Sequence, residues 1–161
     1  MKKDRQRRFG KTQTEYEKWE NSPEGVAYWL GDLPVPEAVE SVIISTVHQL
    51  PGQVREFVYC ECCFSCVAPR GGQTCYLQKA RQPWLILLGQ ELQDESVLAH
   101  QIAHAWLGHR YDPGLAELRA TQQEEDAACD LTREWGFGGC GAETRRRERH
   151  LTGKQKSDLP L

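Results

Sequence analysis

The chain has 161 residues and a net charge of −3, which is typical of one globular domain with short tails. It has no apolar run long enough to span a bilayer, and its basic N-terminus lacks the apolar region of a signal peptide. The sequence therefore predicts a soluble, cytoplasmic protein with no membrane partner. In that reducing compartment, seven cysteines indicate metal ligands or regulatory thiols before disulfides.

Charge is spread unevenly along the chain. Residues 1–11 carry +5 and residues 143–161 carry +3, so the body between them is acidic. We expect residues 1–11 to be a disordered basic arm, residues 12–142 to form a single domain and residues 143–161 to be a flexible basic tail. Such arms either contact nucleic acid or are merely solvated, and the sequence leaves both interpretations open.

Helical signals dominate the first 50 residues. A helix with aromatic anchors is expected from Thr12, with a break at Ser22-Pro23. Pro36 suits the first turn of a second helix, which continues to about Gln49 and ends at Pro51-Gly52.

Strand signals follow. Residues 54–67 are rich in aromatic and β-branched side chains, which favour strands. A short strand is expected at 75–77, and the apolar run at 84–88 indicates a buried strand. Because the connections are too short for helical crossovers, we expect the sheet to be antiparallel.

Two further helices complete the predicted domain. Asp94 is a suitable N-cap for the first of them, and Gly108 marks its end. The second runs from about Leu115 to Trp135 and stops at a glycine-rich segment. Helices, a small sheet and two more helices make an α+β fold.

The penultimate helix carries the strongest functional signal. His100 and His104 are four residues apart, so they share one helix face and can bind one metal ion, for which zinc is the usual choice. The zincin motif is His-Glu-x-x-His, and its glutamate is the general base for water. Here that position is Gln101, whose amide cannot accept a proton at neutral pH.

A third ligand is expected on the last helix. Glu124 falls near the middle of that helix's apolar face and Glu125 at its edge. A carboxylate beside apolar residues needs a partner, which a metal ion would supply. Alternatively, both glutamates are solvated at an acidic helix start, where they interact favourably with the helix dipole.

Residues 99–109 and 125–128 together resemble gluzincin metallopeptidases of the ImmA/IrrE type, in which a His-Glu-x-x-His helix is followed by a helix with Glu-x-x-Ala. The resemblance extends over roughly residues 35–137. It implies zinc held by His100, His104 and Glu125, with Cys129 where the family has Asn or Asp. It also implies a minimal zincin fold, in which a small antiparallel sheet packs on the two metal-bearing helices, with additional N-terminal helices.

The resemblance further implies a zinc-dependent endopeptidase that cleaves a protein partner, a helix-turn-helix transcriptional repressor, in a stress or defence response. With Gln101 at the general-base position, this chain is expected to be inactive. We interpret Gln101 as an engineered, inactivating substitution of the glutamate that the family has at this position. The alternatives are a natural pseudo-protease that binds zinc and recognises a regulator without cutting it, or a nucleic-acid-binding adaptor whose zinc lies on cysteines.

A cluster of cysteines remains to be explained, and it comprises Cys60, Cys62, Cys63, Cys66 and Cys75. Three interpretations stay open. The cysteines hold a second, structural zinc ion. One of them acts as a cysteine switch, in which a thiolate occupies the open position of the catalytic zinc. Otherwise they are free thiols in or beside the sheet.

His109 is a rival metal ligand. The metzincin motif needs its third histidine six residues after the second, with a glycine between them. His109 comes five residues after His104, directly after Gly108. The sequence therefore favours a role for His109 at the end of the helix.

Overall fold

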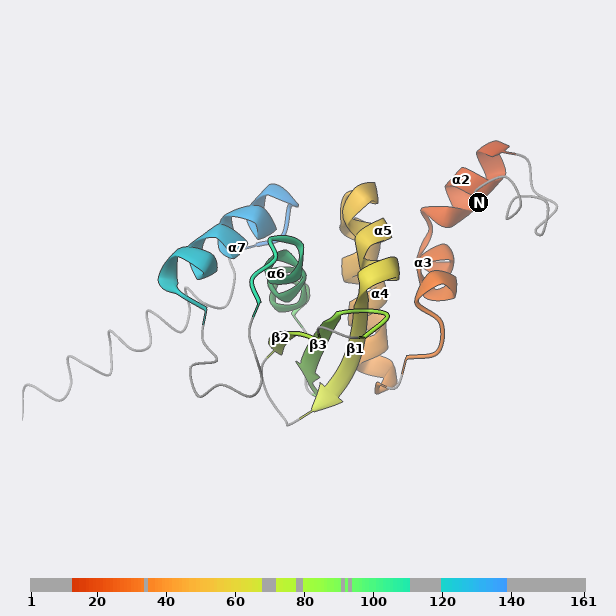
Figure 1. Cartoon of the computed structure of the whole chain (residues 1–161). Coiled ribbons are helices and arrows are strands. Elements are labelled where there is room, and N and C mark those ends of the chain that lie inside the picture. The colour runs from red at the N-terminus through yellow and green to blue at the C-terminus, as the bar shows by residue number, and fades with distance from the viewer. Residues whose placement is uncertain are drawn as a thin grey trace, which may run out of the picture.

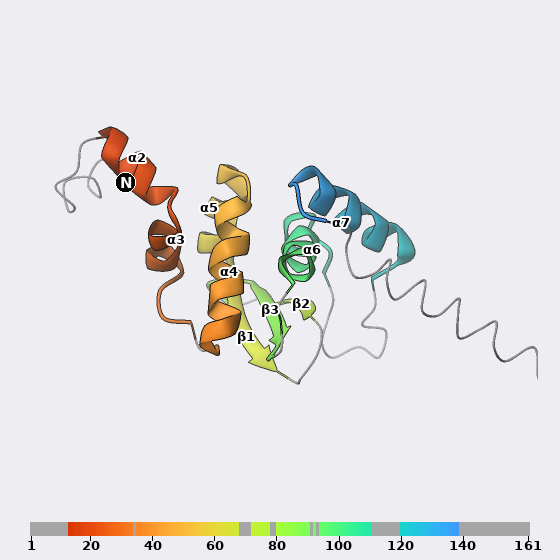
Figure 2. The ribbon, with the colours of Figure 1, turned by 180° about the vertical axis from the view of Figure 1, so that it is seen from behind.

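The computed structural model shows an α+β protein. Six helices and one three-stranded mixed sheet are found in the residues that it describes, which are 13–33, 35–67, 72–77, 80–90, 92, 94–110 and 120–138. Helices α2 and α3 lie at one end and α7 at the other, with the sheet, α4, α5 and α6 between them (Figures 1 and 2). No helix in the described residues is long and apolar enough to cross a membrane.

The N-terminal helical region divides where the sequence predicts. Helix α2 (Gln13–Glu20) ends before Ser22-Pro23, and α3 (Pro23–Leu30) begins there. The Ser22 side chain accepts a hydrogen bond from the Gly25 amide over 3.2 Å, which caps α3. Val26 of α3 is fully buried, and this anchors the region to the core.

Gly25 permits the close approach of α3 to the end of α2. A Cβ atom at this position would overlap the backbone oxygen of Trp19, which no side-chain rotation can move away. We therefore expect Gly25→Ala to lower the free energy of unfolding by about 1–3 kcal/mol, measured by urea denaturation. Gly52→Ala is the matched control, because its Cβ would meet only the Arg55 side chain at 3.8 Å. Equal losses in both variants would contradict this interpretation.

The second helical region is longer than predicted. Helix α4 (Glu37–Gln49) follows Pro36 as expected, but Pro51 then serves as the N-cap of another helix, α5 (Gly52–Glu61). The prediction of strand over residues 54–67 was therefore wrong for residues 54–61, which are helical, and was confirmed for residues 62–67, which form a strand. Val54 and Val58 are both buried, and their spacing of four residues directs them to one side of a helix facing the core. Tertiary packing thus overrides the strand propensity of the intervening residues.

The sheet is mixed, so the prediction of an antiparallel sheet was wrong. Its strands are β1 (Cys62–Val67), β2 (Gly72–Tyr76) and β3 (Trp84–Gly89), in the order β1-β3-β2. Strand β3 pairs parallel with β1 and antiparallel with β2. The parallel pair needs no helical crossover, because the connection from β1 to β3 contains the edge strand β2 itself.

The core lies between the sheet and helices α4, α5 and α6. Phe64, Ile86 and Leu98 represent its contributions from β1, β3 and α6, and each is at most 4% exposed. Helix α6 (Glu95–Trp106) packs on β2 and β3, and α7 (Gln122–Glu134) packs on α6. The predicted start of the last helix near Leu115 lies outside the described residues. Within the described residues, α7 begins at Gln122, directly after its N-cap Thr121.

Candidate metal centre

Helix α6 presents two histidines toward α7. Asp94 caps this helix as predicted, since its Oδ1 accepts hydrogen bonds from the Ser96 amide over 2.8 Å and from the Ser96 hydroxyl over 2.7 Å. His100 and His104 are 6% and 2% exposed, and their ring centroids are 4.6 Å apart. Two imidazoles buried this deeply require polar partners.

The start of α7 decides which glutamate faces them. Thr121 and Glu124 form a capping box, in which the Thr121 hydroxyl accepts from the Glu124 amide and the Glu124 carboxylate accepts from the Thr121 amide over 2.8 Å. Glu124 is thereby used to cap the helix. Glu125, the next residue, reaches the histidines instead, and fully buried Ala128 leaves room for α6 close by.

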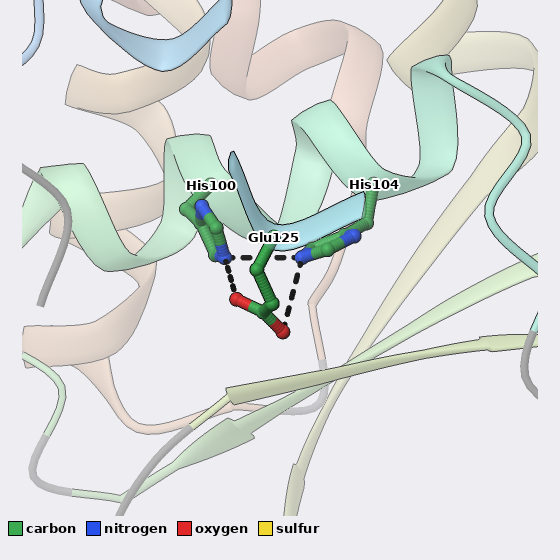
Figure 3. A group of neighbouring side chains, drawn as sticks. All are labelled: His100, His104 and Glu125. Atoms are coloured by element: carbon green, nitrogen blue, oxygen red, sulfur yellow. Dashed lines mark hydrogen bonds and ion pairs between the residues drawn. The ribbon is translucent and has the colours of Figure 1, made fainter. Parts of the chain in front are cut away.

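The side chains of His100, His104 and Glu125 point toward one another (Figure 3). The Nε2 atoms of the two histidines are 3.0 Å apart, and the Glu125 oxygens lie 3.1 Å from His100 Nε2 and 3.8 Å from His104 Nε2. Atoms that carry lone pairs need a proton or a metal ion between them at such separations. Tetrahedral bonds of about 2.0–2.1 Å set neighbouring ligand atoms about 3.3 Å apart, so the three residues fit a metal ion.

The charge of the group also suits a cation. Hydrogen bonds from His100, and then from His104, hold the pKa of the Glu125 carboxyl well below its usual range. Glu125 is therefore ionised at neutral pH. Among the residues that the structure describes, these three form the only group of three or more His, Cys, Asp or Glu side chains close enough to share one ion.

Two further residues contact the outer nitrogens of the histidines. Cys129 Sγ lies 3.8 Å from His100 Nδ1, at the position where the resembled family has Asn or Asp. Cys129 is disulfide-bonded, so the expectation of metal ligands or thiols before disulfides was wrong for this cysteine. Its sulfur has no proton and can only accept a hydrogen bond. His109 Nδ1 lies 2.9 Å from His104 Nδ1. Both contacts leave the Nε2 atoms of His100 and His104 directed at Glu125.

Gln101 is held by the edge strand β2. The Thr74 hydroxyl donates to the backbone oxygen of Gln101 over 2.9 Å or to its side-chain Oε1 over 3.0 Å. Thr74 is only 1% exposed, so this contact joins β2 to α6 in a water-poor environment. The sequence predicted the place of Gln101 on the helix but not its partner on the strand.

The cysteine cluster lies elsewhere. Cys62, Cys63 and Cys66 are on β1, Cys75 is on β2, and Cys60 is exposed at the end of α5. Strand β3 lies between β1 and β2, and β2 is the strand that contacts Gln101. Two strand spacings therefore separate β1 from β2, which is roughly 10 Å. Within the described residues, none of these sulfurs joins His100 and His104.

The β2 cysteine faces away from Gln101. Cys75 alternates with Thr74 along β2, so the two side chains lie on opposite faces of the sheet. Burial raises the pKa of the Cys62, Cys63, Cys66 and Cys75 thiols, and this favours the protonated form over the thiolate that binds metals.

Comparison with protein-family models, with curated proteins and with solved structures gave no match for this chain. The interpretation of the site therefore rests on its residues and their geometry.

Proposed function

We propose that this chain is a zinc-binding protein of the ImmA/IrrE metallopeptidase type, whose site is directed at a protein partner. The observation that carries the proposal is the convergence of His100, His104 and Glu125. Two imidazoles and one carboxylate make up the ligand set of catalytic zinc sites that keep a fourth position open. The packing of the sheet on α6, and of α6 on α7, agrees with the minimal zincin arrangement.

The reaction class of such a site is peptide-bond hydrolysis. A bound zinc ion would polarise the scissile carbonyl and increase the acidity of a water molecule. Glu125 stays ionised, and the imidazoles present their Nε2 atoms, so the chain's own residues suit the binding role. The site lacks a general base to accept the proton of the water molecule, since Gln101 has an amide in place of a carboxylate. We therefore propose that the chain does not cleave peptides as it stands.

The edge strand supports a protein as the partner. Strand β2 lies at an edge of the described sheet, and its Thr74 contacts the residue between the two histidines in the motif. An extended peptide that adds to such an edge would lie beside the site, with backbone hydrogen bonds supplying affinity. Under the resemblance, the partner would be a helix-turn-helix repressor, and the protein would act in transcriptional regulation during stress or defence.

A natural pseudo-protease is the second candidate function. It shares the zinc site and the protein partner but recognises the partner without cutting it. Gln101 favours this candidate, because its side chain already has a buried hydrogen-bond partner in Thr74. The adaptor with zinc on cysteines gains no such support, since the described cysteines form no group of three ligands.

Zinc binding is testable through stability. A ligand that binds only the folded state raises the free energy of unfolding, by about 2.7 kcal/mol at a concentration 100 times its dissociation constant. We expect zinc to raise the unfolding temperature of the chelator-treated protein, measured by differential scanning calorimetry. Magnesium is the control, because it prefers oxygen ligands and should cause no shift. An equal shift with both ions, or none with zinc, would refute the proposed site.

A further inference from the structure

The spacing of His109 from His104 is explained by the way in which α6 ends. Gly108 has φ +75°, a left-handed conformation that glycine adopts without steric cost. The Gly108 amide donates to the Ala105 oxygen over 3.1 Å, and the His109 amide donates to the His104 oxygen over 3.0 Å. These two bonds define a Schellman motif, which returns the chain over the last helical turn.

The same motif brings two imidazoles together. In a Schellman motif, the residue after the left-handed glycine usually has an apolar side chain, which packs on a side chain of the last helical turn. His109 and His104 are these two residues here. Here the two rings occupy those positions, with centroids 5.1 Å apart and Nδ1 atoms 2.9 Å apart. At that distance one Nδ1 must donate a proton and the other must accept it.

The metal centre decides the direction of this hydrogen bond. If the Nε2 of His104 binds a metal, the ring proton must be on its Nδ1, so His104 donates and His109 accepts. An accepting His109 must be neutral. The separation of 2.9 Å between the two Nδ1 atoms fits a hydrogen bond in this direction.

We infer that His109 is a positioning residue for the metal centre, because its Nδ1 accepts the Nδ1 proton of His104 and so directs the Nε2 of His104 at the metal. This inference rests on the proposed zinc site. It gives His109 a role other than that of a metal ligand. It also explains the interval of five residues between His104 and His109, where a third metzincin ligand would need an interval of six. Hydrogen-bond partners of this kind hold the ring orientation and the protonated nitrogen of a ligand histidine.

The test is zinc affinity, measured by competition with a chromophoric chelator at one neutral pH. His109→Leu keeps much of the volume but removes the acceptor, and we expect affinity to fall about 10- to 100-fold. His109→Asn retains an acceptor oxygen near the place of Nδ1, and we expect it to restore most of the affinity. His48→Leu is the matched control, because His48 lies at the end of α4, outside the metal group. We expect this variant protein to bind zinc with wild-type affinity.

A second measurement separates positioning from packing. In the zinc-loaded protein, the Nδ1 proton of His104 should exchange slowly with water in the wild type and in His109→Asn, and rapidly in His109→Leu, as observed by long-range ¹H–¹⁵N NMR. Wild-type affinity in His109→Leu would overturn the inference while leaving the zinc site intact. Equal losses in the Leu and Asn variants would also overturn it. Failure of the wild type itself to bind zinc would instead refute the proposed function.

Discussion

A chain in which His100 and His104 are both replaced by alanine is expected to bind no zinc at this site, whereas the wild-type chain should bind about one ion. The double replacement removes both imidazoles and leaves Glu125 as the single remaining ligand of the group. A single half-buried carboxylate, which is all that Glu125 provides, does not compete effectively with water for zinc. The measurement is metal content by mass spectrometry after dialysis, with circular dichroism to verify folding.

The matched control for this loss is a double replacement in the cysteine cluster. Cys63→Ser together with Cys66→Ser removes the Cys-x-x-Cys pair on β1 but leaves the histidine group untouched. We expect this variant to keep its zinc. If the cysteine variant lost the metal and the histidine variant kept it, the zinc would lie on cysteines, and the adaptor interpretation would replace the peptidase one.

Gln101→Glu is expected to create proteolytic activity. The substitution supplies the carboxylate that a zincin uses as its general base, and a general base typically contributes a factor of about 10² to 10⁴ in rate. Thr74 is placed to donate a hydrogen bond to the new carboxylate, as it does to the side chain present now. Cleavage of candidate helix-turn-helix repressors, and of casein as a general unfolded substrate, would be followed by mass spectrometry against the wild-type chain.

The control carries Gln101→Glu together with His100→Ala and His104→Ala, and it should show no cleavage. Equal cleavage by the wild type and by the single variant would show that position 101 does not act as the base. If neither form cleaves any substrate although both bind zinc and a repressor, the chain is a pseudo-protease. Zinc binding and substrate cutting are thus tested separately.

Features that depend only on residues close together in the chain could be predicted from the sequence. The start of α6 at Asp94 and its end at Gly108 follow from capping chemistry, which acts within a single turn. The pairing of His100 with His104 follows from the helical repeat alone. The break at Ser22-Pro23 and a buried strand at residues 84–88, which is β3 in the structure, were likewise predicted, because turn residues and a continuous apolar run are local signals.

The capping signals contained more information than the prediction used. Thr121 and Glu124 form a recognisable capping box, which assigns Glu124 to the helix start and leaves Glu125 for the metal. Gly108 followed by His109 is the pattern of a Schellman motif, which places residue 109 on residue 104. The capping box and the contact of residue 109 with residue 104 could therefore both have been predicted from the spacing of residues in the sequence. The role of Thr74 was not, since nothing local connects a strand residue with Gln101, 27 positions later.

Three features depend on contacts between distant parts of the chain. They are the pairing and direction of the strands, the helical conformation of residues 54–61 and the positions of the cysteines. Strand pairing joins segments far apart in the chain, so no local pattern specifies that β3 separates β1 from β2. Val54 and Val58 are compatible with a strand until a core forms on one side of them, and burial then selects the helix. The cysteine cluster is dense in sequence, but the alternation of side chains and the strand order distribute its sulfurs over both faces of the sheet.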